Sequence, residues 1–308
     1  MSIRSHRTIH RIRVLGPQHM FVALPSKSSP PYLLTLNVVL WRTYGQCENY
    51  GILSGHKGAV LDLQWSRDSR VLFSASADAT VASWDVETGQ KIRKHEGHEG
   101  VIDCLDVSRR GMEVVVSGSD DGTVGLWDPR QKEALEYIET QYPVTAVAVS
   151  EVASELYTAG IDPDIKVWDM RTKRIIYTLR GHTEMVTSLV VSPDNQSLLS
   201  FSHDNTVRTW DIRPFAPTNR AIRTYEGAQK GLEQNLFRAS WDQEGKRIAA
   251  GGGDEYHSVT VWDVATGNGT KLAGHKGSVN DVRFHPGGEP IGTFFLSSPF
   301  HSIWAYVI

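Results

Sequence analysis

The sequence predicts an all-β protein in which a four-stranded sheet is repeated around a ring, the arrangement of a β-propeller. Two observations support this prediction. Trp-Asp pairs recur at intervals of 43, 41, 42 and 52 residues, and Gly-His pairs recur in phase with them. Each unit of about forty residues is also the length that four short strands and their turns require. The Trp-Asp pairs begin at Trp84, Trp127, Trp168, Trp210 and Trp262.

The composition is that of a soluble chain with a large core: 308 residues, 40% hydrophobic and 22% charged, with a formal net charge of −3. This near balance argues against indiscriminate nucleic-acid binding as the main activity. The two cysteines, Cys47 and Cys104, make a disulfide framework unexpected and favour a reducing, intracellular compartment. The most apolar run, residues 31–41, is too short for a membrane span, and no cleavable signal sequence is expected, so no membrane partner is predicted.

The first unit, which ends at Trp41, is irregular. Residues 1–29 contain neither a Gly-His pair nor an alternating strand, and the stretch RSHRTIHRIR makes the N-terminus basic. We therefore assign residues 1–30 to an irregular basic segment and residues 31–308 to the propeller. The basic segment is expected to be a solvated tail, with a targeting or RNA-contacting arm as the alternative.

The next four units follow one pattern. An alternating strand such as Val60 to Trp65 comes first, a turn that carries an aspartate comes later, and the following strand ends in Trp-Asp. A β-branched residue stands three places before the tryptophan, as Val81 does before Trp84. Residues three apart in a strand point to opposite faces, so both faces of each sheet must be covered. Neighbouring sheets on either side would meet that need.

The last two units depart from the pattern. The interval from Trp210 to Trp262 is about ten residues longer than its neighbours, and its stretch RPFAPTNRAIRTYEGAQKGLEQNLFR is expected to lengthen the connection between two sheets. The final unit opens at Gly274-His275, but residues 291–308 lack the expected turn and Trp-Asp strand and form an atypical end. We therefore predict seven sheets, with an irregular first and last member.

Units of this length, with Gly-His near the start and Trp-Asp near the end, are typical of WD40 repeats, and the chain resembles that family. In WD40 proteins, histidine, aspartate, serine and tryptophan at these positions form a network that ties the Gly-His turn to the inner strands. A buried imidazole and a buried carboxylate are costly unless each finds a partner, and here they can partner each other. The structural network is predicted to contain His56, Asp78, Trp84, His98, Asp121, Trp127, Asp162, Trp168, His182, Asp204, Trp210, Trp262 and His275.

This recurrence favours a structural role over a catalytic triad, which is needed once. No Gly-rich phosphate loop, metal-ligand cluster or isolated carboxylate pair stands outside the repeats. The sequence therefore predicts no catalytic residue, no metal site, no cofactor and no small-molecule substrate.

A loop that follows the Trp-Asp pair at Trp210 is the candidate binding site. Arg213, Pro214, Phe215 and Pro217 place a charge and an aromatic ring on a backbone that two prolines stiffen. Such a composition suits a protein-binding anchor. The alternative, that Phe215 fastens the loop to its own sheet, remains open at this point.

Several longer runs carry a more particular resemblance. DNTVRTWDIRPFAP, GIDPDIKVWDMR and GSDDGTVGLWD make the chain similar to the family of WD40 subunits of the spliceosomal U5 small nuclear ribonucleoprotein. The resemblance covers about Val38 to Ile291. It implies a nuclear, non-catalytic scaffold, monomeric within its complex, that docks on the large central U5 protein and other spliceosome components during pre-mRNA splicing. Direct contact with RNA is left open.

A second hypothesis rests on Trp-Asp-x-Arg, which occurs at Trp127, Trp168 and Trp210. This box resembles the one by which some propellers attach to cullin-RING ubiquitin ligases as substrate receptors. Arginines at these positions also have an ordinary explanation, because they can pair with an acid of a neighbouring sheet.

Overall fold

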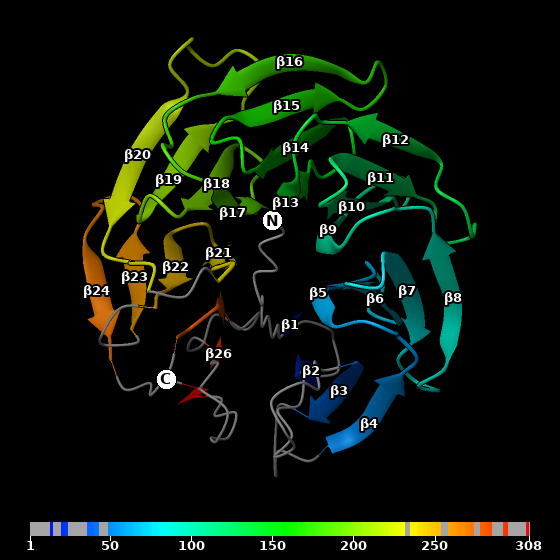
Figure 1. The fold of residues 1–308 in the computed structure, drawn as a ribbon. Helices are drawn as coiled ribbons and strands as arrows, with labels where there is room; N and C mark the ends of the chain where they lie inside the picture. Colours follow the sequence, from blue (N-terminus) through cyan, green and yellow to red (C-terminus); the bar gives the residue numbers. More distant parts are fainter. Residues whose placement is uncertain are drawn as a thin grey trace, which may run out of the picture.

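The computed structural model describes residues 13–14, 20–23, 36–42, 49–231, 235–253, 258–273, 278–284, 292–294 and 306–307, and every regular element in these ranges is a β-strand. The strands pair antiparallel into seven sheets, six of four strands and one of three, within those ranges. Figure 1 shows the sheets set like blades around a central axis. The prediction of an all-β propeller is confirmed.

We number the blades in chain order. Blade 1 contains β1 (Arg13–Val14), β2 (Met20–Ala23), β3 (Asn37–Arg42) and β4 (Asn49–Ser54). Blade 2 contains β5 (Val60–Trp65), β6 (Val71–Ser76), β7 (Thr80–Asp85) and β8 (Lys91–Glu96). Blade 3 contains β9 (Ile102–Val107), β10 (Val115–Ser119), β11 (Thr123–Trp127) and β12 (Glu136–Glu139). Blade 4 contains β13 (Val144–Val149), β14 (Glu155–Gly160), β15 (Ile165–Asp169) and β16 (Arg174–Leu179).

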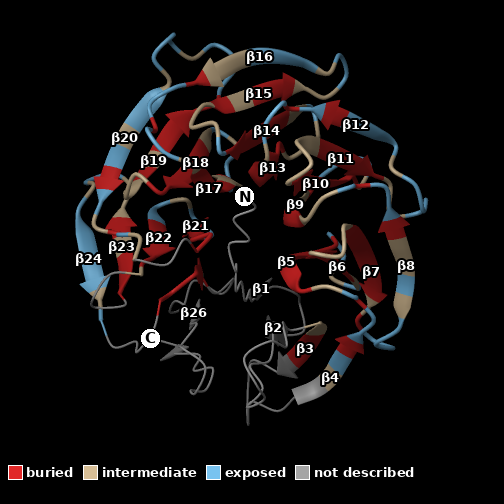
Figure 2. Ribbon diagram, viewed as in Figure 1, coloured by how far each residue is buried: buried red, intermediate tan, exposed pale blue. Residues whose placement is uncertain are grey.

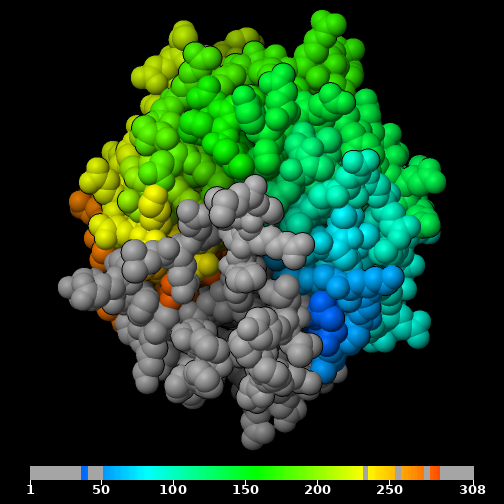
Figure 3. Space-filling model, in the orientation of Figure 1, coloured from blue at the N-terminus to red at the C-terminus, as the bar shows by residue number. Residues whose placement is uncertain are grey.

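Blade 5 contains β17 (Val186–Val191), β18 (Ser197–Ser202), β19 (Thr206–Asp211) and β20 (Ala221–Glu226). Blade 6 contains β21 (Ala239–Trp241), β22 (Arg247–Gly251), β23 (Val259–Asp263) and β24 (Gly269–Leu272). Blade 7 contains β25 (Asp281–Arg283), β26 (Gly292–Phe294) and β27 (Tyr306–Val307). The colours of Figure 3 follow one another around the molecule in this order.

The blades are buried on both faces, as the tryptophan strands require. Val81 and Trp84 point to opposite faces of β7, yet they are 0% and 1% exposed. Figure 2 shows that burial is greatest in the inner strands and falls toward the outer strand of each blade. Neighbouring blades therefore supply the core, and the rim faces solvent.

The turn between the second and third strand of a blade is set by local chemistry. It needs a residue with positive φ, which Gly122 (79°) and Asn205 (65°) provide in blades 3 and 5. Blade 2 has Ala79 there, at φ 62°, where a β-carbon is unfavourable.

In blades 2 to 5, side chains of the inner strand bond the backbone of the next blade. In blade 2, Asp62 accepts the Leu105 N–H of blade 3 at 2.7 Å, while Gln64 donates to the Leu105 carbonyl at 2.8 Å. Thr145 donates to the Val186 carbonyl, which links blade 4 to blade 5. These bonds satisfy backbone groups on the inner edge of each sheet, where no fifth strand pairs.

The long interval between Trp210 and Trp262 connects different elements from those predicted. Its first part, residues 212–220, joins β19 to β20 within blade 5 rather than joining two blades, so the prediction is wrong for this part. The part after β20 does lead to blade 6. The reason is that the RPFAPTNR loop returns into an ordinary outer strand, which pairs Trp210 with Ala221.

The segment before β21 packs into the ring near the central axis. Leu236 is 2% exposed and clusters with Ala59 and Leu61 of blade 2, with Val101 and Met185 packed nearby. Residues of four blades can meet only near the axis. A cavity of about 430 Å³ opens where the inner strands finish, and Trp65, Arg67, Arg109 and Trp241 lie among its lining residues.

Most of the two terminal segments, residues 1–30 and 291–308, lies outside the described residues, as does His275. The described parts place β1 and β2 in the first blade and β26 and β27 in the last. The division into a basic segment and a propeller stays a prediction.

Candidate docking site

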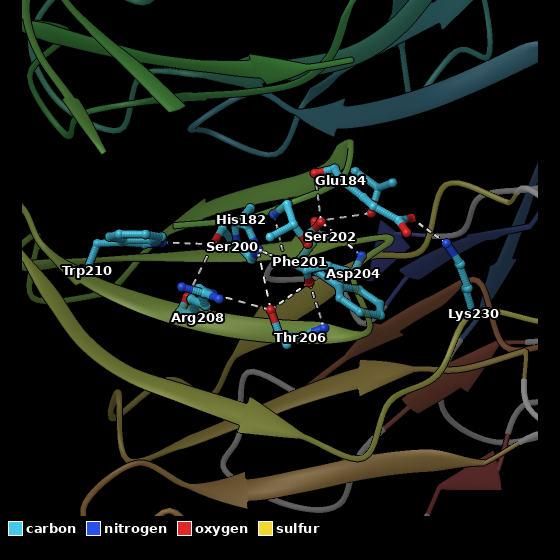
Figure 4. A network of polar contacts seen from close by, with 12 residues as sticks. His182, Glu184, Ser200, Phe201, Ser202, Asp204, Thr206, Arg208, Trp210 and Lys230 are labelled. Carbon is cyan, nitrogen blue, oxygen red and sulfur yellow. Dashed lines mark hydrogen bonds and ion pairs between the residues drawn. The ribbon is translucent and has the colours of Figure 1, made fainter. Parts of the chain in front are cut away.

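The predicted network side chains meet in blade 5. His182 Nδ1 lies 2.8 Å from Asp204 Oδ2, and His182 Nε2 lies 2.7 Å from Ser200 Oγ. Trp210 Nε1 donates to the same Ser200 oxygen at 2.8 Å. Figure 4 shows these side chains converging from the loop before β17, from β18 and β19, and from the turn between those two strands. With Nδ1–H donating to the carboxylate, Nε2 accepts the serine hydroxyl.

Blades 2 and 3 repeat this geometry. In blade 2, His56 bonds Asp78 at 3.1 Å and Ser74 at 2.7 Å, and Trp84 donates to Ser74. In blade 3, His98 bonds Asp121 at 2.8 Å and Ser117 at 2.7 Å, and Trp127 donates to Ser117.

Burial and hydrogen bonding set the protonation of the network. Burial alone would raise the pKa of Asp121, but hydrogen bonds from Thr123 and His98 outweigh it and lower that pKa to about 2. The pKa values of Asp78 and Asp204 are lowered in the same way. Burial lowers the pKa of His98, against the effect of its bond to Asp121. A neutral imidazole bonded to a carboxylate is therefore the resting state of blade 3.

Among the described residues, blades 4 and 6 depart from this set. In blade 4, Asp162 pairs with Lys166 at 3.0 Å instead of a histidine, while Trp168 donates to Thr158. In blade 6, Ala250 occupies the place of the serine, as the pairing of Ile248 with Trp262 shows. Trp262 donates instead to the Glu226 carbonyl at 3.0 Å.

The described ranges contain no group of three or more His, Cys, Asp or Glu side chains placed to hold a metal ion. None of these residues belongs to a helix with the length and apolar character of a membrane span.

The loop of residues 212–220, which we call the docking loop, is held by its own polar contacts. Arg213 Nε lies 3.0 and 3.1 Å from the two Asp211 carboxylate oxygens, and this bond lowers the pKa of Asp211. Arg220 Nη1 donates to the carbonyls of Asp211 and Arg213 at 3.0 and 2.9 Å. The Ala216 N–H closes a turn onto the Arg213 carbonyl. The loop backbone is thus fixed at both ends.

Phe215 points away from this framework. Its side chain is 100% exposed, while Ile212 at the start of the loop is 4% exposed. A ring that touched its own blade would lose most of its exposure, so Phe215 does not fasten the loop. Ile212 does so instead, in the core shared with Trp210. Of the candidate binding residues, Arg213 therefore shapes the loop and Phe215 stands free on it.

Sequence reasoning missed Asp211 and Arg220 as residues that hold the docking loop. Arg220 also places its guanidinium 4.0 Å from the ring centre of Tyr177 on β16. Figure 1 shows the loop at the outer rim between β19 and β20. The repeat pattern of the sequence could not predict the contacts of Asp211 and Arg220, because they form only when the loop folds back on itself.

Known proteins similar to this chain include WD-repeat proteins. The family model described as "WD domain, G-beta repeat" matches residues 47–85, 89–128 and 173–211.

Three relatives cover most of the chain. A pre-mRNA-splicing factor, cwf17, of Schizosaccharomyces pombe is 46% identical over 249 residues, which are 81% of this chain and 73% of the relative. The "U5 small nuclear ribonucleoprotein 40 kDa protein" of Dictyostelium discoideum is 43% identical over 82% of this chain and 71% of its own length. The human protein of the same name is 46% identical, with the same two shares.

Proposed function

Because the chain belongs to the WD40 family of U5 small nuclear ribonucleoprotein 40 kDa proteins and related splicing factors, we propose that it serves as a non-catalytic scaffold subunit of the U5 particle in the nucleus. In this role it binds the large central protein of that particle and holds it together with other spliceosome components. The propeller supplies a stiff frame, and the loops at its rim supply the contacts.

The docking loop carries this proposal. Phe215 exposes a whole aromatic ring on a backbone that Arg213 and Arg220 hold in one conformation. Burying such a ring against a partner removes apolar surface from water without first ordering the loop. We therefore take Phe215 as the anchor for the protein partner.

A non-catalytic role fits the histidine–aspartate pairs. Each pair is saturated by a serine and a tryptophan inside a blade, and the set is repeated in blades 2, 3 and 5. A reacting group would need to face a substrate, whereas the side chains of these histidines are only 0–1% exposed. The hydrogen-bonding atoms of these imidazoles are therefore used within the fold.

A capture experiment tests the proposal. The tagged chain, incubated with nuclear extract, is expected to retain U5 RNA and the large U5 protein, as identified by RNA blotting and mass spectrometry. A tagged human U5 40 kDa protein, which should recover both from the same extract, is the control. If the control recovers both and this chain recovers neither, the proposal is wrong.

The ubiquitin-ligase alternative has only its sequence box in support. The Arg213 guanidinium of that box is bonded to Asp211 within the same blade. The same capture experiment would reveal a cullin adaptor in place of U5 components if this alternative were correct.

A further inference from the structure

A groove beside the docking loop differs in charge from its counterpart one blade further on. The first groove, between blades 4 and 5, has a volume of about 420 Å³ and lies where β16 ends and the docking loop returns to β20. The second, between blades 5 and 6, has a volume of about 390 Å³ and lies where β20 ends and β24 begins. Each includes the tryptophan of its blade, Trp210 or Trp262, in its lining.

The two grooves are built alike but lined unequally. Arg180 and Arg220 line the first, with hydroxyl and amide groups and without any carboxylate. Lys271 lines the second together with Glu226, so the charges there balance. The first groove is therefore the cationic one, and this difference cannot come from the general plan of the propeller.

Arg180 is the more exposed of the two cations in the first groove, and Arg220 is partly buried. Arg180 is 79% exposed in its side chain and touches only one carboxylate of the described chain, Asp164, at 3.2 Å. Arg220 donates to two carbonyls and forms no ion pair with the residues that the structure describes. An anionic group in this groove would add charge-assisted hydrogen bonds to both guanidinium groups.

Exposed apolar side chains lie on both elements that form the cationic groove. Phe215 stands on the loop that forms one wall, and Ile175 and Ile176, 46% and 51% exposed, lie near the start of β16, the strand whose last residues form the other wall. β16 is also the edge strand of blade 4, so its outward N–H and C=O groups face away from the sheet. An extended protein segment could contact the cations, the apolar side chains and the strand edge together. Single-stranded RNA would instead need a row of cations along its backbone.

We infer that the groove between blades 4 and 5 receives an acidic, extended segment of the protein partner, with a carboxylate on Arg180 and Arg220 and an apolar residue against Phe215. This inference rests on the proposed function, because it names the chemistry of the segment that the docking loop would bind. It assigns charge recognition to Arg180, a residue outside the loop.

The first test uses a labelled peptide and fluorescence anisotropy. The probe is an alternating Asp-Leu peptide of about ten residues, a length that one added strand can span. We expect it to bind the intact chain at least about fivefold more tightly than the matching Asn-Leu peptide, with a preference that weakens as salt rises. Equal affinity for the two peptides, or tighter binding of oligouridine RNA, would overturn the inference.

Charge reversals in the two grooves provide the matched control. Arg180→Glu is expected to weaken Asp-Leu binding at least about fivefold, and Lys271→Glu in the second groove by less than about twofold. Equal losses in the two variants would show that the peptide senses only overall charge, which contradicts the inference. Because both side chains are exposed, thermal unfolding should show both variants folded.

The capture experiment separates this inference from the proposed function. If Arg180→Glu retains U5 components as fully as the unaltered chain, the groove inference fails and the proposed function stands. If the unaltered chain retains none, yet Arg180→Glu alone loses the Asp-Leu peptide, the groove binds acidic segments and the proposed function fails.

Discussion

A single hydroxyl joins two side chains in blade 5, since Ser200 bonds both His182 and Trp210, and His182 in turn bonds Asp204. Each of these groups is withdrawn from water and depends on the others for its hydrogen bonds. Removing one partner therefore leaves a buried polar atom unsatisfied, and that loss is larger than the value of the bond itself.

The first prediction concerns the aspartate of this network. Asp204→Ala is expected to lower the free energy of unfolding by about 1–3 kcal/mol, because His182 and the Thr206 N–H lose their acceptor. Asp162→Ala is the matched control: it removes only a pairing with Lys166 and a bond to its own turn, and should cost less than about 1 kcal/mol. Urea unfolding measures both, and equal losses would contradict the role of the histidine.

The second prediction concerns pH. The pKa of His98 is lowered in the folded state, so the unfolded chain binds its proton first and stability falls as pH drops below the ordinary histidine value of 6.5. The pKa of Asp121 is lowered from 3.8 to about 2, which adds a further loss over that interval. The melting temperature should therefore fall in acid in two stages, and a constant value from pH 7 to pH 4 would refute the first.

Residue types and spacing predicted the contacts seen in blades 2, 3 and 5, but the predicted members Asp162 and Trp262 have other partners. Aspartate and histidine 22 or 23 residues apart meet in blades 2, 3 and 5. In blade 6, Trp262 turns to a backbone carbonyl of blade 5, because Ala250 offers no hydroxyl. A contact to a carbonyl leaves no trace in side-chain identity, so the sequence could not predict it.

At the scale of elements, the docking loop differs from its counterparts. Residues 212–220 make it longer than the corresponding connections 86–90, 128–135, 170–173 and 264–268. Its composition predicted a stiff, exposed anchor, but its place in the fold was misjudged. The outer strand β20 is mostly exposed, and its polar and apolar residues do not alternate, so the sequence alone gives little sign of a strand there.

The third prediction separates binding from folding in this loop. Phe215→Ala is expected to weaken capture of U5 components by about tenfold, as the loss of an interface anchor does, while the free energy of unfolding changes by less than about 0.5 kcal/mol. Met112→Ala, another exposed apolar residue at 63% exposure, should change neither quantity. A marked fall in melting temperature for Phe215→Ala would show that the ring supports the blade instead.

At the scale of the whole molecule, one ion pair crosses the central channel. Arg238, just before β21 in blade 6, lies 3.2 Å from Asp62 in blade 2, and both side chains are nearly inaccessible to solvent. The repeats predicted neither residue, because each replaces the small or apolar residue that other blades carry at the same place, such as Ala146 or Ser188. A repeat pattern predicts contacts between residues that repeat, so it cannot predict a long-range contact between residues that do not.

The fourth prediction tests this ion pair. Arg238→Ala is expected to destabilise the chain by about 3–5 kcal/mol, because it leaves the Asp62 carboxylate buried without its counter-charge. Arg223→Ala is the control at the rim: it breaks bonds from blade 5 to two carbonyls of blade 6 and should cost about 1.5 kcal/mol or less. Equal losses in the free energy of unfolding, measured with urea, would show that the ion pair contributes no more than an ordinary contact at the rim.

The packing of Leu236 against Ala59 and Leu61 also joins two blades that are not neighbours in the ring. Leu236 precedes the first strand of blade 6, whereas Ala59 and Leu61 belong to blade 2. Separating these blades would expose the apolar side chains to water, which is unfavourable. The ring is therefore braced across its centre as well as between successive blades.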